Sequence, residues 1–201
     1  MPSKNLDLHG SAPQSSPLVL VLIDTINDME FPEGDQLLKA ARPAARRIAA
    51  LAARCRKAGV PVVYCNDNFG RWRSDFQAQV KHCLEQAVRG REVAALLVPQ
   101  EGDYFVLKPK HSAFFSTVLD TLLSYLGAKK LILCGFAGNI CVLFSANDAY
   151  MRDYEVCVPR DCIASNTAAE NRAALEVMRK ILKADTRVSR RVVVTKAKRR
   201  A

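Results

Sequence analysis

The sequence lacks the features that mark a membrane protein, a zinc protein or a dinucleotide-binding enzyme. No apolar run approaches the ~18 residues that a membrane-spanning helix needs, and the polar stretch from Met1 to Pro17 has no apolar core of a secretory signal. No CxxC pair or Cys/His cluster has the spacing of a zinc site. The first apolar run ends at Asp24 and no GxGxxG follows it. We therefore expect no cofactor, no metal and no membrane contact.

Histidine is also scarce. None of the three histidines, His9, His82 and His111, pairs evidently with a cysteine, so the sequence gives a papain-like Cys–His mechanism no support. The seven cysteines are an odd number, and several lie inside apolar runs, where a free thiol behaves as a small core residue. This usage is typical of a reducing compartment, and we expect a cytoplasmic protein.

The charge balance is basic without forming a recognition motif. The chain has 30 Lys and Arg against 20 Asp and Glu, a net charge of +10, and much of the excess lies within residues 42–57 and 190–200. Such a diffuse excess attracts anions and aids solubility. It does not resemble a groove-reading motif, so we expect no nucleic-acid partner.

Strands alternate with helices along most of the chain. Continuous rather than alternating hydrophobicity indicates strands covered on both faces, as in a parallel sheet. Strands are predicted at residues 18–23, 60–64, 104–107, 131–134, 155–158 and 191–195, and helices at 43–58, 74–89, 116–126, 139–151 and 167–182. Ser116 is predicted to cap one helix, and Thr167 with Glu170 forms a capping-box pattern. The fold class is therefore α/β: a three-layer, doubly wound, Rossmann-like and mostly parallel sheet with helices on both faces.

The chain is expected to form one domain with two short extensions. Residues 1–16, rich in Ser, Pro, Gln and Gly, are expected to form a flexible N-terminal arm. Residues 17–196 form the domain, and residues 197–201 form a basic C-terminal tail. No internal repeat or linker divides the domain.

Polar and reactive residues follow the predicted strands where an α/β sheet binds its ligands. They are Asp24, Asn66 to Asn68, Lys108, the segment from Gly135 to Cys141, and Asp161. Because the carboxyl ends of parallel strands share one edge, we expect an acid, a base and a thiol to converge there.

Cys141 is the sharpest candidate for a nucleophile. It is placed in the first turn of a predicted helix, where free N–H groups and the helix dipole lower a thiol pKa and can hold an oxyanion. Asp24 can accept the thiol proton, and Lys108 can stabilise both anions. The alternative is that Cys141 is one more core cysteine, Asp24 a turn cap and Lys108 a surface lysine.

Four further residues are candidates for substrate binding. Asn66, Asn68 and Trp72 follow the second strand, and their amides and indole suit a small, polar, planar molecule. Ordinary turn chemistry and a packing contact explain them equally well. Phe136 is a candidate wall of the pocket, and core packing is its alternative role.

Three ordered blocks of the sequence resemble the isochorismatase-like cysteine hydrolases. They are Val19 to Asp24, Lys108 to Phe114 with its Ser-Ala-Phe end, and Leu131 to Val142 with Asn-Ile-Cys-Val. Asp161 matches a further position of the family, and the likeness spans roughly residues 18–186.

The resemblance implies a triad in which Cys141 is the nucleophile, Asp24 the base and Lys108 the positioning cation. It also implies a cis peptide bond between Phe136 and Ala137, an oxyanion hole formed by the backbone N–H groups of Ala137 and Cys141, and a homo-oligomer.

Two departures from the family pattern bear on the substrate. Ile26 stands where many members have Gln, and Phe69 stands where nicotinamidase-like members have a metal-binding His, so the resemblance disfavours a zinc or iron site. Isochorismatases proper typically lack the nucleophilic Cys, so Cys141 points to amide, carbamoyl or ureido substrates.

The sequence thus predicts a hydrolase that cleaves a small C–N substrate through a covalent acyl-enzyme. The alternatives are a catalytically silent scaffold or anion-binding partner, and a nicotinamidase- or isochorismatase-type activity.

Overall fold

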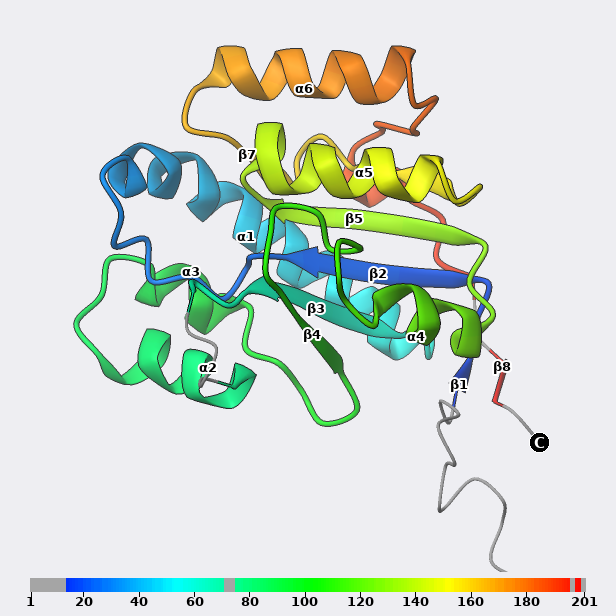
Figure 1. Cartoon of the computed structure of the whole chain (residues 1–201), viewed down its shortest axis with the longest axis horizontal. Helices are drawn as coiled ribbons and strands as arrows, with labels where there is room; N and C mark the ends of the chain where they lie inside the picture. Colours follow the sequence, from blue (N-terminus) through cyan, green and yellow to red (C-terminus); the bar gives the residue numbers. More distant parts are fainter. Residues whose placement is uncertain (1–13, 71–74, 196–197, 200–201) are drawn as a thin grey trace, which may run out of the picture.

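A six-stranded parallel sheet forms the centre of the protein. The computed structural model describes residues 14–70, 75–195 and 198–199. The main path of the sheet runs in the order β4-β3-β2-β5-β6, and β7 also pairs with β5. The strands are β2 (Leu18–Ile23), β3 (Val62–Asp67), β4 (Tyr104–Lys108), β5 (Lys130–Phe136), β6 (Glu155–Cys157) and β7 (Ile163–Ala164). In Figure 1 the arrow of β2 points to the left, which marks the carboxyl edge of the sheet.

Helices cover both faces of this sheet, which gives three layers. They are α1 (Gly34–Lys57), α2 (Phe76–Glu85), α3 (Arg91–Leu96), α4 (Leu119–Leu126), α5 (Leu143–Tyr150) and α6 (Ala168–Lys180). One core contains side chains of α1, α2 and α3, and the other contains side chains of α4, α5 and α6. The predicted fold class is confirmed.

The apolar sequence of β2 explains its central place. All six of its residues are buried. Leu18, Leu20 and Leu22 point into the core beneath α1, whereas the alternate residues Val19, Val21 and Ile23 point into the opposite core. A strand with apolar side chains on both faces is stable only between two layers of helices.

Several element boundaries differ from those predicted. Helix α1 begins at Gly34 rather than at Pro43, which lies inside the helix. Helix α4 begins at Leu119, and Ser116 is not its cap, because Ser116 adopts a left-handed φ of 53° two residues before the N-cap Val118. The short elements α3 and β7 were not predicted.

The predicted edge strand at residues 191–195 is wrong. The chain there forms a single 3₁₀ turn, Ser189–Arg191, followed by irregular backbone. Asp161 fixes this turn, because its carboxylate accepts hydrogen bonds from the Ser189 N–H at 2.7 Å and from the Ser189 hydroxyl at 2.8 Å.

The first and last described segments form a small antiparallel pair. Strand β1 (Gln14–Ser15) pairs with β8 (Lys198–Arg199). Most of the expected N-terminal arm and part of the expected tail lie outside the described residues.

Thr167 is the cap on which the start of α6 depends. Its side chain accepts from the Glu170 N–H at 3.2 Å, and the Glu170 carboxylate accepts from the Thr167 N–H at 2.9 Å, as predicted. Thr167→Ala should therefore lower the free energy of unfolding by about 1 kcal/mol. The control Thr121→Ala, at an exposed position in the first turn of α4, should change it by less than about 0.5 kcal/mol. Urea denaturation of both variants tests this, and equal losses would contradict it.

Candidate active site

The register of the sheet brings four functional side chains to one edge. Asp67 at the end of β3 lies opposite Lys108 at the end of β4. Asp24 follows the last residue of β2, and its N–H donates to the carbonyl of Cys65 on β3 at 3.0 Å. Cys141 comes from the turn after β5, which pairs with the other side of β2.

Lys108 joins the other three side chains. Its ammonium is fully buried, and its Nζ lies 2.9 Å from Asp24 Oδ2, 3.3 Å from Asp67 Oδ2, 3.5 Å from Cys141 Sγ and 3.1 Å from the carbonyl oxygen of Lys110. Burial alone lowers the pKa of a lysine, but the attraction of Asp24, Cys141 and Asp67 outweighs it, so the pKa of Lys108 is raised. Lys108 is therefore a permanent cation. The alternative interpretation of Lys108 as a surface lysine is wrong.

Asp24 is held in position from two sides. Its φ of 50° lies in the left-handed region, which Asp tolerates better than most residues, and its Oδ1 accepts the N–H of Asp67 at 2.6 Å. Burial raises the pKa of the Asp24 carboxyl, whereas the Lys108 charge and hydrogen bonds from Cys141, Lys108 and Asp67 oppose that rise. The carboxylate is thus a stronger proton acceptor than an exposed Asp.

Cys141 lies in a π-helical turn, Gly138–Val142, that precedes α5. Cys141 is partly exposed, unlike the other six cysteines, which are buried. Burial and the Asp24 carboxylate raise the pKa of the Cys141 thiol, and Lys108 lowers it by less. The expectation that the helix N-terminus yields a lowered thiol pKa is therefore corrected, because desolvation and the neighbouring carboxylate dominate. The thiol holds its proton at rest and shares it with Asp24.

The turn before Cys141 has two backbone features. The peptide bond between Phe136 and Ala137 is cis, as the family resemblance implied. Gly135 has a φ of 131°, and a Cβ at this position would overlap the carbonyl oxygen of Ile23 on the neighbouring strand. Only glycine lets β5 and β2 approach so closely at the site.

The candidate substrate-binding residues have structural contacts of their own. The Asn66 amide donates to the carbonyl of Ile26 at 2.6 Å, and its Oδ1 has no partner among the described residues. The Asn68 Oδ1 accepts the N–H of Gly70 at 2.9 Å, which is turn chemistry. Phe136 is fully buried in the core under α1. Trp72 lies outside the described residues.

Two functional neighbours were not predicted from the sequence. Asp67 is among the polar residues expected at the strand ends, but no role is predicted for it, and its carboxylate is a partner of Lys108. No role is predicted for His111, yet its Nδ1 lies 4.0 Å from Cys141 Sγ. The spacing of His111, three residues after Lys108, was the available signal.

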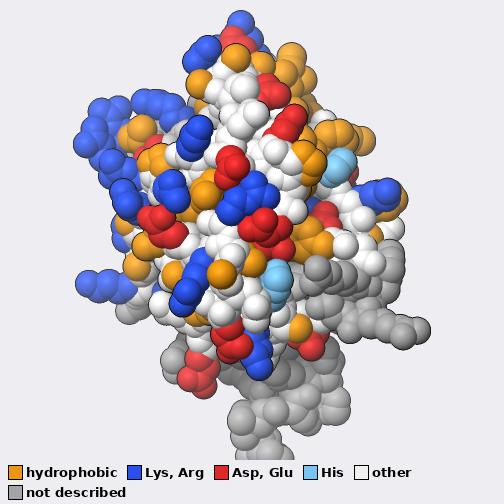
Figure 2. All heavy atoms as spheres, turned by 90° about the vertical axis from the view of Figure 1, so that its left-hand side faces the viewer, with side chains coloured by type: hydrophobic (Ala, Val, Ile, Leu, Met, Phe, Trp, Pro, Cys, Tyr) orange, Lys and Arg blue, Asp and Glu red, His pale blue; other side chains and the backbone are white. Residues whose placement is uncertain are grey.

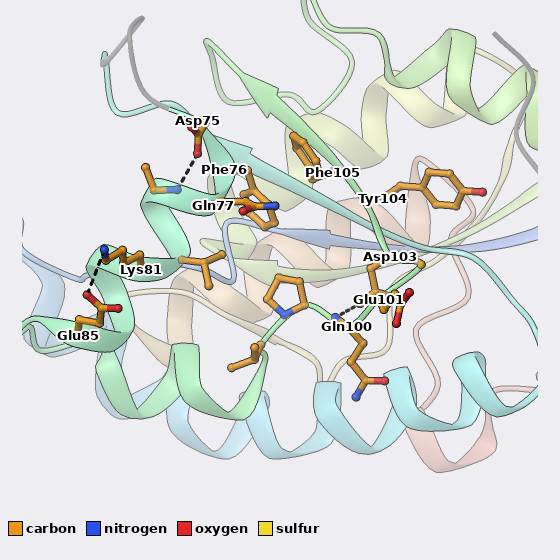
Figure 3. Close-up of a pocket in the computed structure, with 15 residues that line it drawn as sticks. Asp75, Phe76, Gln77, Lys81, Glu85, Gln100, Glu101, Asp103, Tyr104 and Phe105 are labelled. Carbon is orange, nitrogen blue, oxygen red and sulfur yellow. Dashed lines mark hydrogen bonds and ion pairs between the residues drawn. The ribbon is translucent and has the colours of Figure 1, made fainter. Parts of the chain in front are cut away.

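A cavity of about 270 Å³ lies on the α2 side of the site. Its lining includes Gln79, whose amide donates to the carbonyl of Asp67 at 3.0 Å. A larger pocket of about 710 Å³ lies between α2, the loop at residues 98–103 and β4. Figure 3 shows that Asp75, Phe76 and Phe105 line this pocket. Asp24, Lys108 and Cys141 line neither cavity.

The surface at the carboxyl edge carries charges of both signs. Figure 2 views the molecule from this end, and acidic and basic side chains are interspersed there rather than forming a field of one sign. Within the described part of the chain, no group of three or more His, Cys, Asp and Glu side chains is placed to hold a metal ion. No helix in that part is long and apolar enough to cross a membrane.

The model of the isochorismatase domain matches residues 19–188 of the chain. The chain belongs to the isochorismatase family. It is 40% identical, over 174 residues, to the uncharacterized isochorismatase family protein YaaI of Bacillus subtilis (strain 168), covering 87% of this chain and 95% of that protein. The protein is therefore an isochorismatase-family hydrolase.

Solved structures similar to this chain share its fold. An isochorismatase family protein from Desulfovibrio vulgaris is 25% identical with a TM-score of 0.71, covering 87% of this chain and 95% of its own. An N-carbamoylsarcosine amidase from Thermoplasma acidophilum is 26% identical with a TM-score of 0.64, covering 88% of this chain and 99% of its own.

Alkylation of Cys141 by iodoacetamide should keep accelerating past pH 9.0, the ordinary value for a thiol, because the raised pKa leaves little thiolate at neutral pH. Lys108→Met should slow the reaction further, since it removes the cation that lowers the thiol pKa. Lys130→Met, at a partly exposed Lys whose Nζ lies 3.6 Å from Glu155, should leave the rate unchanged. Mass spectrometry of the Cys141 peptide measures the rates, and a plateau near neutral pH would contradict this account.

Proposed function

We propose that this isochorismatase-family protein is a cysteine hydrolase that cleaves the C–N bond of a small amide, carbamoyl or ureido substrate. The carrying observation is the contact chain from Sγ of the partly exposed Cys141 to Lys108 Nζ at 3.5 Å and from Lys108 Nζ to Asp24 at 2.9 Å. A nucleophile, a cation and a proton acceptor within mutual reach are the parts that acyl transfer to a thiol requires.

In the first half-reaction, Asp24 takes the thiol proton and Cys141 Sγ attacks the substrate carbonyl carbon. The raised pKa of Asp24 suits this transfer, because a buried carboxylate accepts a proton more readily than an exposed one. Lys108 stabilises the sulfur as its negative charge develops. The backbone N–H groups of Ala137 and Cys141 are proposed to hold the oxyanion.

The tetrahedral intermediate then collapses and the C–N bond breaks. The proton on Asp24 goes to the leaving nitrogen, which departs as an amine or as ammonia. The acyl group remains on Cys141 as a thioester. Water hydrolyses the thioester in the second half-reaction and restores the thiol.

The proposed substrate class is supported by the thiol nucleophile and by a structural relative. The structural likeness to an N-carbamoylsarcosine amidase supports a carbamoyl or amide substrate. A metal-dependent, nicotinamidase-type activity is less well supported, because Phe69 offers no ligand atom and Asp67 already pairs with Lys108 at 3.3 Å. We also propose that the substrate is a small molecule and that the protein forms a homo-oligomer.

Cys141→Ala should lower turnover by about 10⁴-fold or more, because the covalent route is lost. A panel of small amides, carbamoyl compounds and ureides measures turnover, and mass spectrometry detects the acyl adduct on Cys141. The matched control is Cys83→Ala, which removes a buried thiol on α2 and should keep turnover within about twofold. Wild-type turnover by Cys141→Ala would contradict the proposal, as would a protein that turns over no member of the panel and acquires no adduct, which is the outcome expected of a silent scaffold.

The pH dependence of kcat/KM should reflect the pKa of Asp24, which burial raises. Asp24 accepts a proton only when it is ionised, so activity is present above its pKa and is lost as the pH falls through it. Because burial raises that pKa, kcat/KM should reach half its maximum on the acid side above pH 3.8, the ordinary Asp value. Circular dichroism at each pH checks that the fold persists. A half-maximum at or below pH 3.8 would contradict the assignment of Asp24 as the base.

A further inference from the structure

His111 contacts the sulfur from the exposed side of the site. Its Nδ1 lies 4.0 Å from Cys141 Sγ, and its exposed imidazole lies beside the ring of Phe144, with ring centroids 5.6 Å apart. Lys108 and Asp24, both buried, hold the same sulfur from the interior. The sulfur therefore lies between a buried ion pair and a solvent-facing imidazole.

The loop that carries His111 is fixed on both sides of it. Before His111, the carbonyl of Lys110 accepts a hydrogen bond from Lys108 at 3.1 Å. After His111, the N–H of Ala113 donates to Ser145 Oγ at 2.9 Å, and the Ser145 hydroxyl donates to the carbonyl of Cys141 at 2.7 Å.

Ser145 lies on α5, and Ser112, the next residue after His111, adds a second connection between the loop and this helix. Its hydroxyl donates to the carboxylate of Asp148 on α5. The loop and the backbone of the nucleophile are thus joined through Ser145, and the imidazole is exposed without being loosely placed.

Asp24 is ionised again once it has given its proton to the leaving nitrogen, but it lies on the buried side of the site. Asp24 is only 4% exposed, its Oδ1 already accepts the Asp67 N–H at 2.6 Å, and its Oδ2 accepts from Lys108 at 2.9 Å. His111, by contrast, is exposed to solvent, and its Nδ1 lies 4.0 Å from the sulfur that carries the acyl group. Imidazole is the side chain best suited to move protons near neutral pH.

We propose that His111 is a second proton-transfer group of this site, which activates water to hydrolyse the acyl-enzyme. The inference rests on the proposed cysteine hydrolase function. A water molecule loses a proton to the neutral imidazole of His111, and its oxygen forms a bond to the thioester carbonyl carbon. The C–S bond then breaks, the carboxylic or carbamic acid product leaves, and the imidazolium returns the proton to the thiolate of Cys141. The step consumes one water, needs no further reactant, and makes His111 a catalytic residue.

The test separates acylation from deacylation with p-nitrophenyl acetate. Release of p-nitrophenolate follows acylation of the thiol, and intact-protein mass spectrometry after rapid quenching follows the acetyl adduct. His111→Gln should release the first equivalent of p-nitrophenolate at a rate within about twofold of wild type, whereas steady-state turnover should fall by about 10²-fold. The acetyl group should therefore accumulate on Cys141.

Two control variants make the result specific. His82→Gln removes an imidazole on α2 whose Nε2 lies 3.0 Å from the Asp28 carboxylate. This variant should behave as wild type in both phases. His111→Ala should accumulate the adduct as well, and added imidazole should restore its deacylation, a rescue that a merely structural role of His111 does not give.

Three results would overturn the proposal. In the first, His111→Gln deacylates at the wild-type rate. In the second, the substitution slows acylation as much as turnover, so that no adduct accumulates. In the third, Cys141→Ala turns over the ester as fast as wild type, which contradicts the cysteine mechanism itself and so removes the foundation of the inference. The first two leave the proposed function standing.

Discussion

The site depends on the ion pairs that the buried ammonium of Lys108 makes with two carboxylates. A lysine without water must be compensated by nearby negative charge, because an unpaired buried ion costs several kcal/mol. Here the compensation comes from Asp24 at 2.9 Å and Asp67 at 3.3 Å. Each partner lies at the end of a different strand, so the ion cluster can form only when β2, β3 and β4 are paired in register. The same charges that satisfy Lys108 also decide where the thiol proton lies.

The charge balance explains how one cation serves two anions in turn. At rest, the pKa of the Cys141 thiol is raised, so the sulfur is protonated and Asp24 neutralises Lys108. When the proton moves to Asp24, the negative charge moves to the sulfur, which lies 3.5 Å from the same ammonium. The net charge of the buried cluster does not change during this transfer, so little desolvation energy is spent on it.

The sequence predicted the central architecture because that architecture rests on local patterns. The apolar run Leu18–Ile23 is β2, and the Thr167 and Glu170 pattern is the capping box of α6. The prediction of Ser116 as a cap is wrong, because Ser116 adopts a left-handed φ. The prediction of a strand at residues 191–195 is wrong, because Asp161 holds Ser189 in a turn. A tertiary contact decided the second case.

Within the site, the sequence could indicate which residues converge but not how they interact. The strand-end rule brought Asp24, Lys108 and Cys141 to one edge, and the structure places them in contact. The direction of the thiol pKa shift depends on desolvation and on the distance to Asp24, neither of which a sequence shows. The roles of Asp67 and His111 were not predicted for the same reason, since they come from distances across strands and loops.

The charge state of Lys108 tests the central claim most directly. In protein labelled with ¹⁵N-lysine, the Nζ resonance of Lys108 is assigned by its absence from the Lys108→Met spectrum and followed against pH. We expect a slowly exchanging ammonium that stays protonated above pH 10.5, the ordinary lysine value, and that shifts in Asp24→Asn. A Lys108 that loses its proton below pH 10.5 would contradict the account.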